Sequence, residues 1–438
     1  MKRQLKILAP ASHLRRQSLR FKVICLLLLL FTIHYSLFTV VEAKVYIDIT
    51  SPGAKKLPIA IFDLEGPSGK EISEIIRDDL TFTGLFMYID KASYIESVSQ
   101  PFNTKNWTPL GIEAVVKGDV LEEKNLTATI SLYDTFEGKE IFRKQYQAEK
   151  DLLRQLSHNI ANDIYKALTG KSGMFRSKIA FVAEDNGEKS IYIMDWDGHR
   201  IKKLGLKGTI VLTPHWSPDG AKIIYSSERG RQWGIFLINF SRMTDKKIFD
   251  AKGINMAGDF FPKGDSFVFS SSKDGTPDIY TFNMDDGKIR KITSSYGIDV
   301  SPAVSPDGEH IAFVSDRGGS PQVYLMRSDG SEVRRLTFEG SYNTSPSWSP
   351  LGDRIVFSGR RGGKNHVCII KPDGSELTQL TEHGNNEDPS FSPDGRYITF
   401  SSDRDGTKGV YLMRANGEAQ KEITPKGLRA LGPRWSPN

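Results

Sequence analysis

Cysteine is almost absent from this sequence of 438 residues. Cys25 lies in an apolar run near the N-terminus, and Cys368 is the only other cysteine. If the N-terminal run is removed during export, the remaining chain has no pair of cysteines to join. We therefore expect no internal disulfide.

The sequence also lacks the short motifs of several common enzyme classes. It contains no Gly-x-Ser-x-Gly elbow, no His-Glu-x-x-His motif, no Walker phosphate loop and no Gly-x-Gly-x-x-Gly fingerprint. The stretch from Gly359 to Lys364 is one residue short of the phosphate loop. We expect no catalytic residues, no metal and no cofactor.

A surplus of positive charge is absent outside the first 43 residues. The formal net charge of the whole chain is +6, but residues 1–43 contain seven Lys or Arg and one Glu. The rest of the chain therefore has equal numbers of basic and acidic residues. A nucleic-acid partner is not expected from such a balance.

Residues 1–43 have the three parts of a secretory signal. A basic stretch ends at Lys22, an apolar run covers residues 23–41, and Val41-Glu42-Ala43 resembles a cleavage site. Cleavage between Ala43 and Lys44 is the preferred interpretation, and an uncleaved membrane anchor is the alternative. The pair Arg15-Arg16 leaves the export route open between the general and the twin-arginine pathways.

Residues 44–172 contain no repeat, and their pattern predicts a small α/β domain. Alternating residues from Val45 to Ile49 predict a first strand, and further strands are predicted at residues 57–62, 85–89, 114–118 and 126–130. Ser68 followed by Glu71 has the spacing of a capping box at the start of a helix. A second helix is expected from Asp151, with its end at Gly170.

Residues 173–438 are built from repeats. A proline-containing turn recurs, with Ser-Pro-Asp-Gly at residues 217–220, 305–308 and 392–395, and its prolines stand at 218, 262, 306, 350, 393 and 437. A catalytic group is needed once, whereas a structural turn is needed in every unit. The recurrence therefore favours a structural turn over a reactive loop.

Each repeat contains four short strand-like segments separated by tight turns, as in residues 302–336. Six four-stranded units of this length predict a six-bladed β-propeller. The first unit lacks its own first strand, and residues 433–437 form a first strand with no sheet after it. We therefore expect the C-terminal strand to close the ring beside residues 178–182, which removes the exposed sheet edges of an open array.

Several residues of the repeats fit structural roles. In the Ser-Pro-Asp-Gly turn the proline sets φ and the glycine takes a positive φ. The turns related to residues 316–319 are also structural, although their charges could bind a partner. Cys368 occupies a third-strand position that is aromatic in the other repeats, so it is expected to pack in the core. One first-strand position is expected to pack between blades and contains Trp216, Trp348, Phe391 and Trp435.

These residues resemble the TolB family, whose members belong to the Tol–Pal envelope system. The repeats contain Trp-Ser-Pro-Asp-Gly, Ser-Asp-Arg-Gly-Gly and Val-Tyr-Leu-Met segments like those of the family's propeller. In the first domain, residues 44–49, 58–60 and 79–86 resemble segments of the family's α/β domain. The resemblance covers residues 44–438, and the second repeat departs from it at residues 258–263.

The resemblance implies a non-enzymatic periplasmic protein. Its expected partners are Pal, the peptidoglycan-associated lipoprotein, which would bind the propeller, and TolA, which would bind the N-terminal region. Other envelope proteins are further candidates, a monomer is expected, and the implied role is in outer-membrane integrity and constriction during cell division. Two alternatives stay open, a glycan-binding exported propeller and the non-catalytic part of a hydrolase.

Propeller geometry predicts where such a partner docks. The connections from each fourth strand to the next first strand gather at one channel mouth and differ in sequence, whereas the turns at the opposite end are alike. Apolar residues in these loops are costly to expose without a partner. The predicted partner-binding residues are Ile210, Met256, Ile298, Tyr342, Asn386 and Arg429. The predicted N-terminal switch strand, which would modulate docking, consists of Val45, Tyr46, Ile47, Asp48, Ile49 and Thr50.

Overall fold

The computed structural model describes residues 56–185, 187–205 and 210–438. The predicted signal segment, its cleavage point at Ala43 and Lys44, and the predicted switch strand at residues 45–50 lie outside the described residues. Within these described ranges, none of the helices combines the length and the apolar composition needed to cross a bilayer.

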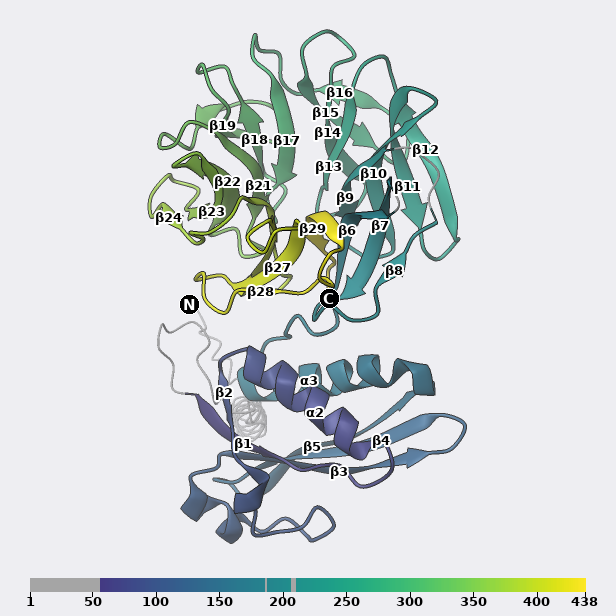
Figure 1. The fold of residues 1–438 in the computed structure, drawn as a ribbon, viewed down its shortest axis with the longest axis vertical. Helices are drawn as coiled ribbons and strands as arrows, with labels where there is room; N and C mark the ends of the chain where they lie inside the picture. The colour runs from purple at the N-terminus through teal and green to yellow at the C-terminus, as the bar shows by residue number, and fades with distance from the viewer. Residues whose placement is uncertain (1–55, 186, 206–209) are drawn as a thin grey trace, which may run out of the picture.

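A five-stranded mixed sheet forms the first domain (Figure 1). Its order is β2-β1-β3-β4-β5; β1 is parallel to β2 and β3, and β3, β4 and β5 are antiparallel. The strands are β1 (Leu57–Ile61), β2 (Phe86–Tyr88), β3 (Ala114–Glu122), β4 (Leu126–Asp134) and β5 (Lys139–Ala148). The sequence reasoning missed β5, because this edge strand is polar on much of both faces and gives no apolar alternation.

Two helices, α2 (Gly69–Phe82) and α3 (Leu153–Thr169), lie between the sheet and the propeller (Figure 1). The predicted capping box at α2 is wrong. The Ser68 hydroxyl does not cap the helix; it donates to Glu122 Oε2 at 2.6 Å, across the loop to the end of β3. The predicted end of α3 is confirmed, because Gly170 adopts a left-handed φ of 74°. Four short 3₁₀ helices complete the domain: η1 (Lys91–Ser93), η2 (Thr104–Asn106), η3 (Thr108–Leu110) and η4 (Lys150–Leu152).

Strand β1 is buried on both faces because each face of the sheet is covered. Ile59 and Ile61 belong to the core shared with the helices. Ala60 and Phe62 point to the other face, where they pack in a second cluster with Trp107. This arrangement explains why β1 reads as a continuous apolar run rather than as an alternating strand.

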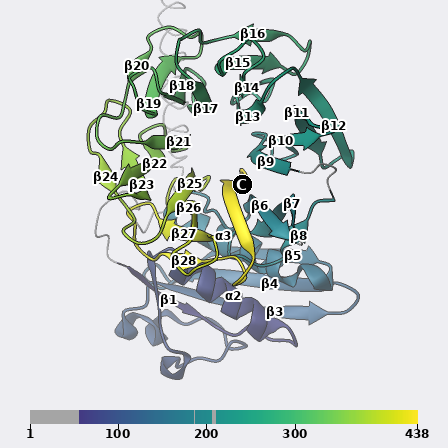
Figure 2. The ribbon, with the colours of Figure 1, turned by 45° about the horizontal axis from the view of Figure 1, so that its top comes forward.

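Six four-stranded antiparallel sheets form the propeller, with their first strands nearest the central axis (Figure 2). Blade 1 contains β29 (Arg429–Trp435), β6 (Lys178–Asp185), β7 (Glu188–Asp195) and β8 (Lys202–Lys203); blade 2 contains β9 (Ile210–Trp216), β10 (Lys222–Arg229), β11 (Gln232–Asn239) and β12 (Thr244–Asp250); blade 3 contains β13 (Asn255–Phe260), β14 (Ser266–Ser271), β15 (Asp278–Asn283) and β16 (Ile289–Lys291). Blade 4 contains β17 (Asp299–Val304), β18 (His310–Ser315), β19 (Gln322–Arg327) and β20 (Arg334–Arg335); blade 5 contains β21 (Asn343–Trp348), β22 (Ile355–Arg361), β23 (Lys364–Ile370) and β24 (Thr378–Gln379); blade 6 contains β25 (Asn386–Phe391), β26 (Tyr397–Ser402), β27 (Gly409–Arg414) and β28 (Lys421–Glu422).

The C-terminal strand closes the ring as the sequence predicts. Strand β29 pairs with β6 in antiparallel register, with Trp435 opposite Ile179 and Arg429 opposite Glu184. The backbone N–H of Ser436 also donates to the carbonyl of Lys178 at 2.7 Å. Blade 1 is therefore assembled from the two ends of the repeat region.

The first strand of most blades contains a β-bulge built on a left-handed residue and a proline. The left-handed residues are Thr213, Ser301, Ser345, Asp388 and Gly432, with φ between 49° and 62°, and each precedes a proline. Blade 3 has Gly258 where the others have this proline. A Cβ on Gly258 would come within 2.8 Å of Pro302 in the next blade, so close packing requires glycine there. This is the structural consequence of the departure in the second repeat.

The Ser-Pro-Asp-Gly turns are structural, as predicted. The Ser305 hydroxyl donates to Asp307, whose carboxylate also accepts from the Glu309 N–H at 2.9 Å. Gly308 has a φ of 76° and lies against Pro262 in the turn of the preceding blade. The repeated turn therefore closes its own hairpin and packs against its neighbour.

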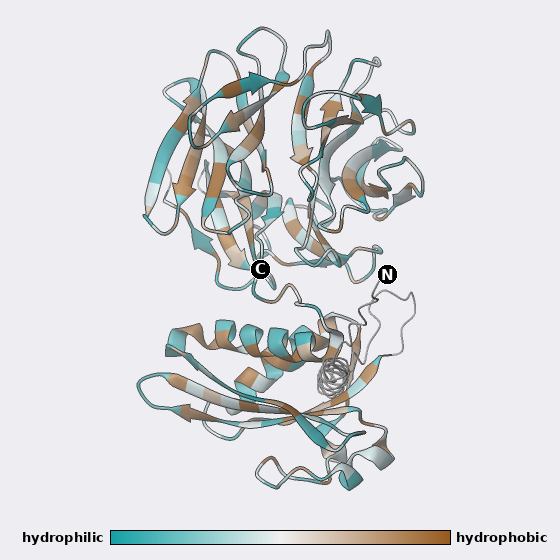
Figure 3. Ribbon diagram, turned by 180° about the vertical axis from the view of Figure 1, so that it is seen from behind, coloured by the Kyte–Doolittle hydropathy of each residue, from teal (hydrophilic) through white to brown (hydrophobic). Residues whose placement is uncertain are grey.

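Apolar residues run along the strands of the propeller (Figure 3). Clusters of them pack between neighbouring blades. Cys368 is fully buried in this core, as predicted. The predicted inter-blade aromatic position is also confirmed, because the Trp216 indole donates to the carbonyl of Arg434 at 3.1 Å and the Trp348 indole to that of Ala303 at 3.2 Å. Both hydrogen bonds connect neighbouring blades.

Candidate partner-binding face

The propeller has two different ends. The connections from fourth strands to first strands lie beside the turns between second and third strands. For example, the N–H of Ile298 donates to Asp316 Oδ1 at 2.7 Å, and that of Asn385 to Asp403 Oδ1 at 2.7 Å. We call this end the loop face. The Ser-Pro-Asp-Gly turns and the turns between third and fourth strands lie at the other end.

The α/β domain covers part of the end opposite the loop face. Phe82, at the end of α2, stacks on Tyr397 of blade 6 and contacts Trp196 of blade 1, with both pairs of ring centroids 5.2 Å apart. Arg414 of blade 6 donates to the carbonyl of Phe82. Since the domain is anchored here, the loop face stays open to a partner.

A buried charge cluster reinforces this domain contact. His158 of α3 is 2% exposed and lies between Asp79 of α2, at 2.7 Å from its Nδ1, and Asp197 of blade 1, at 3.3 Å from its Nε2. Burial alone would lower the pKa of His158, but the two carboxylates raise it to about 9. Burial raises the pKa of Asp79 to about 6, whereas His158 and Arg154 lower that of Asp197, despite its burial. The histidine is therefore a cation that joins the two domains.

The same cluster includes a group with metal-ligating chemistry. His158, Asp195 and Asp197 place one ligand atom each within 4.8 Å of one another. However, Lys178 is 2.8 Å from the Asp195 carboxylate, and Arg154 is paired with Asp197. These cations already neutralise the acids, so a divalent ion would add charge that the cluster cannot balance. The group is better explained as an interdomain ion network.

The predicted partner-binding residues do not all reach the surface. Ile298, Tyr342 and Arg429 are exposed on the loop face. Ile210 and Met256 are half-buried, and Met256 lines the channel rather than the tip of its loop. Asn386 is fully buried, so its prediction as a contact residue is wrong.

Asn386 is buried because it connects the loop to its own blade. Its side-chain NH₂ donates to the carbonyl of His383 at 2.9 Å, and its Oδ1 accepts from Arg404 at 2.8 Å. Asp299 has the same position in blade 4, where Arg317 binds it with distances of 2.8 and 2.9 Å. Arg317 and Arg404, which lie in turns between second and third strands, are thus structural. Each binds a residue at the start of the first strand of its own blade.

Three further exposed apolar residues of the loop face are not among the predicted site residues. They are Ile254, Tyr296 and Phe338, and each lies within four residues of a predicted site residue. Their position in a connection between fourth and first strands was the available signal. Together with Ile298 and Tyr342 they occupy the connections that lead into blades 3, 4 and 5. We call these five residues the apolar rim.

The apolar rim is held on ordered backbone. The N–H of Ile254 donates to the Ser272 hydroxyl at 2.9 Å, and the N–H of Ile298 is bound by Asp316. Phe338 is 73% exposed, and its ring has the Arg335 guanidinium 5.0 Å from its centroid. A preformed surface loses little conformational freedom on binding, which favours affinity.

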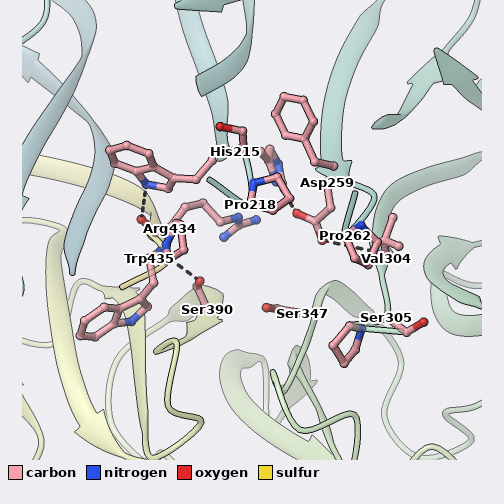
Figure 4. A pocket seen from close by; sticks show the side chains of 15 residues that line it. His215, Pro218, Asp259, Pro262, Val304, Ser305, Ser347, Ser390, Arg434 and Trp435 are labelled. Carbon is pink, nitrogen blue, oxygen red and sulfur yellow. Dashed lines mark hydrogen bonds and ion pairs between the residues drawn. The ribbon is translucent and has the colours of Figure 1, made fainter. Parts of the chain in front are cut away.

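The channel contains polar residues from several blades (Figure 4). His215 of blade 2 pairs with Asp259 of blade 3 at 2.6 Å, and burial lowers the pKa of the histidine. Arg434 donates to its neighbouring carbonyl of Pro433 at 3.0 Å and, with Ser347, lines a cavity of about 310 Å³. Within the described ranges, no serine or cysteine side chain is hydrogen-bonded to His215. The histidine–aspartate pair therefore serves to join two blades.

Comparison with known proteins agrees with both domains. Residues 165–438 match the family model of the TolB beta propeller domain, and residues 45–141 match that of the TolB amino-terminal domain. A Tol-Pal system protein TolB from Geobacter sulfurreducens is 37% identical over 213 residues, which are 46% of this chain and 49% of the relative. The protein of that name from Roseobacter denitrificans is 35% identical, over 41% of this chain and 44% of its own length. These alignments span about half the length of the curated relatives.

A solved structure matches over a longer range. The crystal structure of TolB from Acinetobacter baumannii aligns with a TM-score of 0.79 and 28% identity, covering 90% of this chain and all of the other. Fold and loop face together define a two-domain protein in which an α/β domain is anchored to one end of a closed six-bladed propeller. With a family model that matches more than half of its length, the chain belongs to the TolB family.

Proposed function

We propose that this chain is a non-enzymatic scaffold of the Tol–Pal system in the periplasm. The propeller binds Pal, the peptidoglycan-associated lipoprotein, and the N-terminal region binds TolA. In this role the protein supports outer-membrane integrity and constriction during cell division. Membership of the TolB family supports the system, and the apolar rim is the observation that supports the site.

The apolar rim supports docking because its residues gather on one face. Five large apolar side chains are exposed in three successive connections, whereas single exposed apolar residues are common on any surface. Aromatic side chains near the centre of an interface supply much of its affinity. The rim offers Tyr296, Phe338 and Tyr342 for this purpose, and Arg429 of blade 1 lies on the same loop face.

A binding titration with purified Pal from the same cell tests the site. Tyr296→Asp and Tyr342→Asp should each weaken binding by at least about tenfold, or roughly 1.4 kcal/mol, because each buries a charge in an apolar contact. Leu351→Asp is the matched control: Leu351 is apolar and 68% exposed, but it lies in a Ser-Pro turn at the opposite end. Equal losses from Leu351→Asp and the rim variants would place the site elsewhere.

The role of residues 44–50 needs its own experiment. Removal of these residues should abolish TolA binding and change the affinity for Pal, if the segment acts as the proposed switch strand. The cleavage point has a separate test: the intact mass of the exported protein should be that of a chain that begins at Lys44, after cleavage between Ala43 and Lys44. A truncated protein with unchanged affinity for both partners would remove this part of the proposal and leave the rim site intact.

A further inference from the structure

A groove with an apolar floor separates blades 1 and 2 at the end opposite the loop face. Its volume is about 540 Å³, within the range of roughly 300–1,000 Å³ that is usual for small-molecule sites. The floor contains Trp216 and Phe240 of blade 2, whose ring centroids are 5.7 Å apart, with Ile193 and Leu204 of blade 1. All four are only partly buried, so the groove leaves apolar surface open to solvent.

The rim of this groove is cationic. Four basic side chains line it, Lys178, Arg200, Lys202 and Lys203, against the acids Asp195 and Asp245. Both acids are already paired inside the protein: Asp195 with Lys178 at 2.8 Å, and Asp245 with Arg229 and the Tyr225 hydroxyl at 2.7 Å each. Lys203 approaches a carboxylate only at 3.9 Å, that of Asp185. The groove therefore retains a net positive rim.

Met243 adds an exposed apolar side chain at the edge of the groove. It is 83% exposed and lies in the turn between β11 and β12, with a φ of 49°. Left-handed residues also occur in the corresponding turns of other blades, at Arg200, Glu332, Glu376 and Ala419, so this φ belongs to the repeated turn and only the exposed apolar side chain is particular to Met243. Methionine is also well suited to contact irregular apolar ligands, because it is flexible and polarisable.

The corresponding groove between blades 5 and 6 shows that these features are not general to the propeller. It has a volume of about 410 Å³ and Phe391 at the position of Trp216. Thr378 and Gln379 pair with β23 there as Lys202 and Lys203 pair with β7. Ala415 also replaces Phe240. The groove between blades 5 and 6 therefore lacks the second aromatic residue and the pair of lysines that line the groove between blades 1 and 2.

We propose that the groove between blades 1 and 2 binds an amphipathic anion, a molecule with a short aliphatic or aromatic body and one carboxylate or phosphate. The apolar body lies on Trp216 and Phe240, and the anionic group is held by Lys202 and Lys203. A cavity of this size takes a single chain rather than a membrane surface. The site lies at the opposite end from the apolar rim, so a bound anion does not occupy the proposed Pal site.

Isothermal titration of the purified protein tests this proposal with three probes kept below their micelle concentrations: octanoate, octyl phosphate and the uncharged octyl glucoside. The charge-reversed variant Lys202→Glu/Lys203→Glu should weaken binding of both anions by at least about tenfold. Binding of octyl glucoside should not change in this variant. Lys288→Glu, on an exposed lysine of blade 3, is the matched charge control and should leave all three affinities unchanged.

The apolar half of the site has a separate variant that cannot disturb the core. Met243→Ser should weaken binding of all three probes, because it removes an apolar contact for their octyl chains. Met243 is almost fully exposed in the free protein, so the substitution leaves the core intact. Tighter binding of octanoate or of octyl phosphate would identify the preferred head group. The proposal is overturned if the anions do not saturate the protein, or if their binding is insensitive to charge reversal at Lys202 and Lys203.

Discussion

Replacement of His158 by alanine should destabilise the folded protein strongly and in a pH-dependent way. The histidine is buried between Asp79 and Asp197, and although burial alone would lower its pKa, these carboxylates raise it from the ordinary value of 6.5 to about 9. At about 1.4 kcal/mol per pKa unit, this difference corresponds to roughly 3 kcal/mol of folding free energy. Removal of one partner from a buried ion pair is expected to cost about the same, roughly 3–5 kcal/mol.

The direction of the pH dependence follows from the raised pKa. The folded protein binds the His158 proton more tightly than the unfolded chain does. The contribution of this proton to the free energy of unfolding is therefore complete below about pH 6.5 and is lost as the pH rises through about 9. The cavity left by the alanine contributes a loss that does not depend on pH, so the two effects are separable.

Urea unfolding of the parent and of His158→Ala at pH 6, 8 and 10 measures this difference in stability. The gap between the two proteins should be largest at pH 6 and should narrow by pH 10. His199→Ala is the matched control, because this histidine also neighbours Asp197 but its side chain is 59% exposed. A gap of equal size at pH 6 and pH 10 would show that His158 is neutral in the folded protein and would refute the reasoning.

Three further predictions concern the propeller. Trp435→Ala should cost roughly 3–5 kcal/mol, because it empties a buried inter-blade position in the strand that closes the ring; a melting temperature like that of the parent would contradict this. Arg317→Ala should cost roughly 3–5 kcal/mol by leaving the fully buried Asp299 unpaired, whereas Arg327→Ala, which breaks only a surface pair, should cost less than about 1 kcal/mol in the same urea titration. Burial raises the pKa of the Cys368 thiol, so iodoacetamide should not label the native protein until it is unfolded; rapid native labelling, followed by mass spectrometry, would show that the blade opens.

The repeat pattern was sufficient to predict the architecture of the second domain. The regular spacing of the prolines gives the number of blades, and the unpaired first strand at the C-terminus gives the ring closure with β6. The turn chemistry of Ser305 to Gly308 was also predictable, because the hydrogen bonds involved join residues close together in the chain. The resemblance of both domains to the TolB family rested on the same local segments.

The details of the binding face could not be predicted in this way. The sequence indicated the connections that form the loop face but not which of their side chains reach solvent. Asn386 is buried in its blade, where Arg404, 18 residues away, donates to its Oδ1, whereas Tyr296 and Phe338 stay exposed, the latter with the Arg335 guanidinium 5.0 Å from its ring centroid. At α2, Ser68 bonds to Glu122 instead of capping the helix.

The sequence by itself determined the elements of this protein that depend on neighbouring residues: strand periodicity, turns, the number of blades and the order of the two domains. Only the tertiary structure decided which end of the propeller is open. The opposite end is covered because the α/β domain is attached there by Phe82, which contacts Trp196 and Tyr397, and by His158, which lies between Asp79 and Asp197. These contacts join residues far apart in the chain, and their energies come from burial and charge pairing that no local pattern records.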